Sequence, residues 1–169
     1  MTKTLRLATI ALLLLPAAAM AHEYWLLPDR FSARPAETIA IEHRVGTGWP
    51  GETLPRSAAR IVRFGLVDRL GERPIEGEEG ADPAGTTALR RPGAAFAVYR
   101  SRPSSVHLEA AAFESYLREE GLEAVIARRA ASGESAAPGL EIFSRNAKAL
   151  LTAPGHGDAA GDARLLRRP

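Results

Sequence analysis

The chain of 169 residues contains 22 Lys and Arg, 20 Asp and Glu, and no cysteine. The lack of cysteine excludes disulfides, thiolate metal ligands and a lipid attached through cysteine, so any metal site needs histidine, carboxylate or amine ligands. The net charge is only +2, and no basic stripe with interleaved aromatic residues supports nucleic-acid binding.

The first 21 residues predict a secretory signal peptide. Lys3 and Arg6 form a positive start, a nine-residue apolar run follows, and the small residues Ala19 and Ala21 precede the expected cleavage site. The uncharged stretch that ends at Ala21 has 15 residues, whereas a membrane-spanning helix needs about 20, so an uncleaved anchor is the less favoured alternative. We therefore expect a mature periplasmic protein without a membrane span, in which 20 basic residues balance 20 acidic ones.

The next segments predict β-strands. A short apolar run at residues 24–27 ends at Pro28, and from Thr38 to Val45 apolar residues occupy every second position. This period of two is typical of a half-buried strand. His43 lies on its apolar face, where a hydrogen-bonded core histidine is the more frequent explanation and a metal ligand is the alternative.

Residues 46–52 form a loop of turn-forming residues around an aromatic side chain, Trp49. Glycine and proline at this density mark a connection between strands. We interpret Trp49 as an anchor that folds the loop back onto the domain, and the alternative is a platform on which a ligand stacks.

Two further strands are expected at residues 61–67 and 94–100. In the first of them, Val62, Phe64 and Leu66 should share one face. Between the two strands, residues 68–75 are expected to form a tight turn and a short returning strand. The segment at residues 76–85 is acidic and rich in glycine and proline, but it lacks the spacing of a calcium-binding loop. We expect it to be solvated.

After Val106 the apolar residues change to helical spacing, in two sets that do not form one continuous stripe. Two short helices are therefore predicted within residues 109–130. A final strand is expected over residues 140–152, and residues 154–169 should form a disordered tail. The fold class expected from these patterns is mainly β, with a short helical excursion near residues 109–130.

Cleavage after Ala21 would make His22 the first residue of the mature chain. Its α-amine and imidazole would then form one chelate ring, a donor pair that suits divalent nickel, cobalt or copper. The alternative is that cleavage leaves a histidine first by chance. His43 and His107 are candidates for further metal ligands, although a surface or capping role explains His107 equally simply. No HxH or HExxH pair in the sequence indicates a preformed site.

Six segments of the mature chain resemble one bacterial envelope family. They are HEYWLLP at residues 22–28, RVG at 44–46, GWPGE at 48–52, YRS at 99–101, FESYLREEGL at 113–122 and SRNAKAL at 144–150. On these segments the chain is similar to domain-of-unknown-function family 4198, whose members are often labelled periplasmic components of nickel or cobalt uptake. The resemblance covers residues 22–152.

The resemblance implies an immunoglobulin-like antiparallel β-sandwich over residues 22–153 and an N-terminal histidine available for a metal ion. Of the candidate ligands, only His22 falls on a position that the resemblance supports, whereas His43 and His107 do not. Family members usually continue past the last matching segment into another β-rich module, so we expect this chain to be a truncated product.

The leading functional hypothesis is a non-enzymatic periplasmic accessory protein that binds nickel, cobalt or copper through His22 and serves a membrane metal transporter. The alternative is an immunoglobulin-like module of the cell envelope that binds a protein or glycan through its loops and has no role in metal binding. An enzyme has the least support, because the sequence contains no nucleophile elbow, HExxH motif or phosphate-binding loop.

Overall fold

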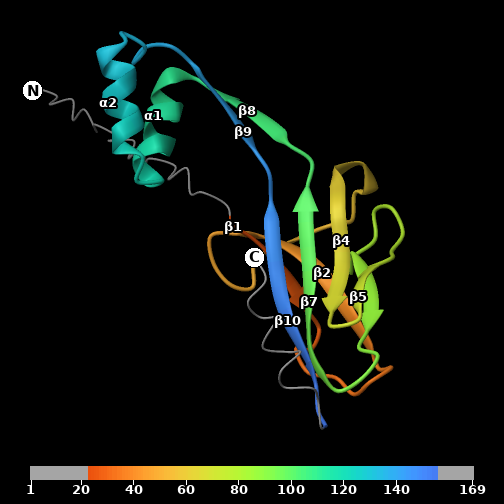
Figure 1. The fold of residues 1–169 in the computed structure, drawn as a ribbon. Coiled ribbons are helices and arrows are strands. Elements are labelled where there is room, and N and C mark those ends of the chain that lie inside the picture. Colours follow the sequence, from red (N-terminus) through yellow and green to blue (C-terminus); the bar gives the residue numbers. More distant parts are fainter. Residues whose placement is uncertain (1–22, 156–169) are drawn as a thin grey trace, which may run out of the picture.

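The computed structural model describes residues 23–155 (Figure 1). Strands make up 47% of it and helices 17%, which confirms the predicted mainly β class. The expected signal peptide, His22 and residues 156–169 of the expected tail lie outside the described residues.

The first sheet is built around its longest strand, β2. All of its pairings are antiparallel: β1 lies along one edge of β2, while β3 and β6 pair with different halves of the other edge. The strands of this sheet are β1 (Glu23–Pro28), β2 (Thr38–Gly46), β3 (Glu52–Leu54) and β6 (Gly85–Ala88).

The second sheet has the order β10-β7-β4-β5 and is also antiparallel throughout. A single turn of 3₁₀-helix, η1 (Ala58–Arg60), leads into it from the first sheet. Its strands are β4 (Ile61–Asp68), β5 (Gly71–Pro74), β7 (Gly93–Ser101) and β10 (Asn146–Ala153).

The two sheets pack face to face and form the antiparallel β-sandwich that the sequence predicts. Ile39, Ile41 and His43 alternate along β2 and all point into the core, where each is at most 2% exposed. The second sheet contributes Phe64, Leu66, Ala95, Ala97 and Leu151 to the same cluster. Burying one such aliphatic side chain stabilises a fold by about 1.5–3 kcal/mol, so this alternation fixes which face of each sheet points inward.

Val62 does not lie on the inner face of β4, as the alternation predicts. It is 53% exposed, while Phe64 and Leu66 are buried. The register of β4 against β7 shifts between Ile61 and Arg63. A β-bulge inserts one residue that has no partner and reverses the alternation locally, which explains why Val62 points to solvent.

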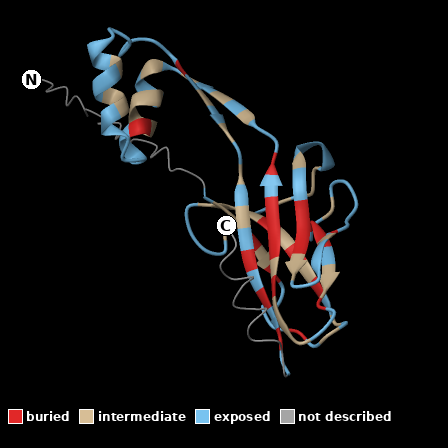
Figure 2. Ribbon diagram, viewed as in Figure 1, coloured by how far each residue is buried: buried red, intermediate tan, exposed pale blue. Residues whose placement is uncertain are grey.

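An arm leaves the sandwich between β7 and β10 (Figure 1). It consists of a two-stranded antiparallel ribbon that carries two helices, and both helices start within the predicted range 109–130. Most residues of the arm are exposed or intermediate, whereas the buried residues gather in the sandwich (Figure 2). The elements of the arm are β8 (Ser104–Leu108), α1 (Ala110–Glu119), α2 (Glu123–Ala131) and β9 (Gly139–Phe143).

The strand predicted over residues 140–152 is in fact two strands, β9 and β10, which belong to different sheets. The break lies at Ser144 and Arg145. There the backbone amide of Arg145 donates to Oγ of Ser101, and the backbone amide of Ser101 donates to the carbonyl of Arg145, each at 2.9 Å. These bonds close the base of the arm, because Ser101 ends β7, where the chain leaves the sandwich, and Arg145 is where it returns.

Candidate functional site

The start of β1 is the part of the structure that adjoins the predicted mature terminus. Glu23 is the first residue of β1, it is exposed, and its register partner is Gly46 at the end of β2. His22 itself lies outside the described residues. The backbone immediately after His22 is therefore paired with the central strand of the first sheet.

His43 lies within a cluster of aromatic rings between the two sheets. Its ring centroid is 4.7 Å from that of Tyr99, 4.8 Å from that of Phe64 and 5.8 Å from that of Tyr24. The imidazole is 2% exposed, and its Nε2 has no hydrogen-bond partner among residues 23–155. The prediction of a core histidine is thus right in its placement, but the hydrogen bond expected with it is missing at Nε2.

The surroundings of His43 keep its imidazole neutral. The pKa of His43 is lowered from 6.5 to about 4, mainly by burial and secondly by the positive charge of Arg56, while Asp82 acts in the opposite direction. A neutral imidazole is the form that binds metals. However, the register partner of His43 is Leu26, which follows Glu23 by three residues in β1. Three residues of extended strand span about 10 Å, so His43 lies about that far along the sheet from the start of β1.

The tyrosines of the cluster remain protonated at neutral pH. Burial raises the pKa of Tyr24, and the neighbouring Tyr99 adds to this effect; burial also raises the pKa of Tyr99. The guanidinium of Arg145 lies over the Tyr24 ring, with its carbon 5.7 Å from the ring centroid. We assign these rings to packing, because a neutral buried phenol is neither a nucleophile nor an anionic ligand.

His107, the other candidate ligand, lies on the arm. It is exposed on β8, and its register partner on β9 is Leu140. His43 is therefore buried inside the sandwich, whereas His107 belongs to β8. Figure 1 shows β8 in the ribbon that extends from the sandwich. Within residues 23–155, no three His, Asp or Glu side chains gather in an arrangement that could hold a metal ion.

A pair of tryptophans lies beside the start of β1. Trp49 stacks on Trp25 with 6.2 Å between ring centroids and 19° between ring planes. The loop approaches so closely that a Cβ atom at Gly51 would lie 2.5 Å from Cζ2 of Trp25. Trp49 is nevertheless 68% exposed. It therefore covers Trp25, as the loop-anchor interpretation requires, and still offers much of its surface to solvent.

Two charged residues of β2 adjoin the tryptophan pair. Arg44 is the register partner of Trp25, and its Nη1 donates to the carbonyl of Gly51 at 3.2 Å. The same guanidinium pairs with Glu42. The surface around Trp49 thus combines an exposed aromatic ring with hydrogen-bonding groups held in place by an ion pair.

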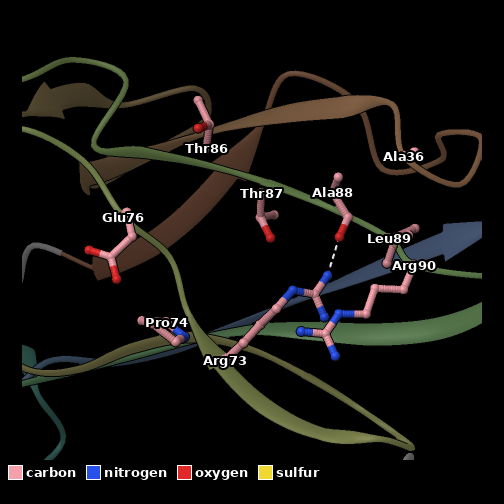
Figure 3. A pocket seen from close by; sticks show the side chains of 9 residues that line it. All are labelled: Ala36, Arg73, Pro74, Glu76, Thr86, Thr87, Ala88, Leu89 and Arg90. Carbon is pink, nitrogen blue, oxygen red and sulfur yellow. Dashed lines mark hydrogen bonds between the residues drawn. The ribbon is translucent and has the colours of Figure 1, made fainter.

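A groove of 570 Å³ lies where β5 of the second sheet meets β6 of the first. Its side chains include Arg73 and Arg90, Thr86 and Thr87, and Glu76 (Figure 3). Sequence reasoning missed this site. Its residues come from two sheets and a connecting loop, and no motif in the sequence links them.

No helix between residues 23 and 155 is long and apolar enough to cross a membrane. Comparisons of the chain with protein-family models, with curated proteins and with solved structures found no match.

Proposed function

We propose that this protein is a periplasmic metal-binding accessory protein. After removal of the signal peptide, the α-amine and imidazole of His22 chelate one divalent nickel, cobalt or copper ion for delivery to a membrane transporter. The observation that best supports this proposal is that β1 begins at Glu23 and pairs with β2 from that residue onward. A chelate one residue ahead of a paired strand loses less conformational freedom on binding than one on a long unpaired tail.

An open coordination sphere suits delivery. Two nitrogen ligands from one residue leave several positions of a divalent ion for water or for groups of the receiving protein. A carrier that encloses its ion completely would release it slowly. The absence of a three-residue metal cluster between residues 23 and 155 is therefore compatible with a carrier, and it leaves His22 as the principal ligand of the proposal.

The test compares the processed protein with the same protein acetylated at its α-amine. Acetylation keeps the imidazole but breaks the chelate ring, because the amine becomes an amide nitrogen. We expect at least a hundredfold loss of copper and nickel affinity, measured by competition with a chromophoric chelator. His107→Ala serves as the control and should bind both metals like the wild type. Equal affinity of the processed and acetylated proteins would disprove the proposal.

A second candidate function is a saccharide-binding module of the envelope, and the 68% exposure of Trp49 favours it. Sugar rings stack their C–H faces on tryptophan, and Glu42 and Arg44 could bind the hydroxyls. Soluble N-acetylglucosamine oligosaccharides should then quench tryptophan fluorescence. Trp49→Ala should abolish the response, while Phe31→Ala, which removes another exposed aromatic ring, should not. An unchanged response in Trp49→Ala would reject this candidate.

A further inference from the structure

The outer face of the second sheet carries a row of apolar side chains, which we call the apolar row. It consists of Leu150, Phe96 and Val67, which are register partners on the neighbouring strands β10, β7 and β4. Successive residues of a strand point to opposite faces, so these three point away from the core, to which Leu66 and Leu151 belong. Leu150 is 41% exposed. In Figure 1 the first sheet lies behind the second, and no labelled element covers this outer face.

Three exposed cations lie beside the apolar row on the same face. Arg63 of β4 and Arg100 of β7 are register partners, and Lys148 of β10 pairs with Val98, which points to the same face as Arg100. Side chains at such diagonal positions lie about 7–8 Å apart. Like charges at directly opposite positions destabilise a sheet. This arrangement therefore works against folding and favours a role in binding.

A neighbouring acid neutralises only one of these cations. Glu72 is the single acidic residue at the outward positions of the four strands, and Arg63 donates to both of its carboxylate oxygens at 2.8 Å. The side chain of Glu72 passes over Gly65, where an added Cβ atom would lie 2.8 Å from its Oε1. Arg100 and Lys148 form no hydrogen bond or ion pair with any residue from 23 to 155. The face thus holds two unpaired cations next to the apolar row.

We propose that this face binds the surface of membranes that contain anionic phospholipids. The lipid phosphates bind Arg100 and Lys148, and the apolar row contacts the boundary between the headgroups and the acyl chains. An arginine donates to phosphate through a planar group with several N–H donors, and a lysine acts as a point charge. Surfaces that combine basic and apolar side chains bind anionic bilayers without crossing them. This role goes beyond the proposed metal site, because it uses residues of β4, β7 and β10 alone.

The position of these residues within the sheet argues against two other partners. The backbone of β7 is paired with β4 on one side and with β10 on the other, so the centre of the face offers no free N–H and C=O groups to an added peptide strand. A second copy of the chain would place the same cations against each other across a two-fold axis, where they repel. A lipid surface needs no bonds to the backbone, and it supplies many negative charges beside an apolar layer.

The test measures binding of the metal-free mature protein to vesicles by co-sedimentation. Vesicles of equimolar phosphatidylcholine and phosphatidylglycerol provide the anionic surface, and vesicles of phosphatidylcholine alone are the neutral control. We expect binding to the anionic vesicles to be tighter by about tenfold or more, and to weaken as sodium chloride screens the charges. Inorganic phosphate should weaken binding no more than sodium chloride of equal ionic strength does. A stronger effect of phosphate would show that the cations bind a free anion, and it would overturn the proposal.

Exposed residues of the arm provide matched control variants. Arg100→Gln and Lys148→Gln should each weaken binding to the anionic vesicles about fivefold, whereas Arg128→Gln in α2 should leave it unchanged. Leu150→Gln should also weaken binding, and Leu140→Gln on β9 should not. All five side chains are exposed, so the variants should fold like the wild type. A lack of binding to anionic vesicles, equal binding to both kinds of vesicle, or equal effects of Arg100→Gln and Arg128→Gln would overturn the proposal.

Discussion

At the scale of single residues, His43 shows what a two-residue period predicts and what it leaves open. The alternation along β2 predicts that His43 points inward, and it is 2% exposed. The alternation carries no information about which rings of the other sheet meet the imidazole. Phe64 and Tyr99 do so through the packing of β4 and β7 on β2. For this reason the sequence predicted a hydrogen bond, whereas the imidazole packs among aromatic rings and its Nε2 has no hydrogen-bond partner among residues 23–155.

The lowered pKa of His43 makes stability depend on pH. The pKa falls from 6.5 to about 4 on folding, so protons bind this group more tightly in the unfolded chain. The neutral imidazole of His43 makes its full contribution to the free energy of unfolding above pH 6.5. This contribution is lost as the pH falls toward 4, at about 1.4 kcal/mol per pH unit. Urea unfolding at several pH values should show this slope in the wild type.

A comparison of the wild type with His43→Leu isolates the effect of the imidazole, because the carboxylates titrate in both proteins and their effect cancels in the difference. The free energy of unfolding of His43→Leu should depend less on pH between 6.5 and 4 than that of the wild type. The difference across this range should be about 3 kcal/mol. Parallel pH profiles for the two proteins would show that the imidazole does not titrate as described.

The proposed chelate at His22 depends on pH in a related way. An imidazole ordinarily titrates near pH 6.5 and an α-amine near 7.7–8.0, and both must lose a proton to bind a metal ion. Copper affinity of the processed protein should therefore fall on the order of a thousandfold between pH 8 and 5.5. At any one pH, copper should bind more tightly than nickel, and nickel more tightly than cobalt. A pH-independent affinity measured by chelator competition would exclude both nitrogens as ligands.

At the scale of elements, periodicity predicted the class of most segments but not their ends or pairings. The alternation of β9 runs on into β10, so a single strand was expected where the chain changes sheets at Ser144 and Arg145. The strand β8, which begins at Ser104, was not predicted at all. A two-stranded ribbon has little core of its own, and the sequence pattern of its strands is correspondingly weak. The groove at β5 and β6 was not predicted for a related reason. It arises where the two sheets pack together, and the periodicity of the strands does not specify that packing.

The helices of the arm pack on the ribbon through Phe113. A Cβ atom added at Gly139 would overlap the Phe113 ring, which also contacts the guanidinium of Arg129 at 4.8 Å from the ring centroid. Gly139→Ala should therefore destabilise the arm locally by about 1–3 kcal/mol. Hydrogen exchange of the amides in α1 and α2 should accelerate, while the strands of the sandwich keep their protection.

The control for this substitution is Gly48→Ala. A Cβ atom at Gly48 would meet nothing within 4 Å, so exchange throughout the protein should be unchanged. Slower or unchanged exchange of the helices in Gly139→Ala would show that Phe113 does not hold them against β9.

At the scale of the whole molecule, the sandwich presents separate surfaces that different functions could use. The start of β1 and the tryptophan pair lie together beside the end of β2. The charged groove lies where β5 meets β6.

Native mass spectrometry of the exported protein tests both the proposed cleavage after Ala21 and the binding of one metal ion by the terminal histidine that it produces. We expect a mature species that has lost residues 1–21 and that carries one copper ion when an equimolar amount is supplied. The same species with an acetylated α-amine should remain metal-free under these conditions. A mature protein that retains residues 7–15, or one that starts at His22 and binds no copper, would disprove the proposed metal-binding function.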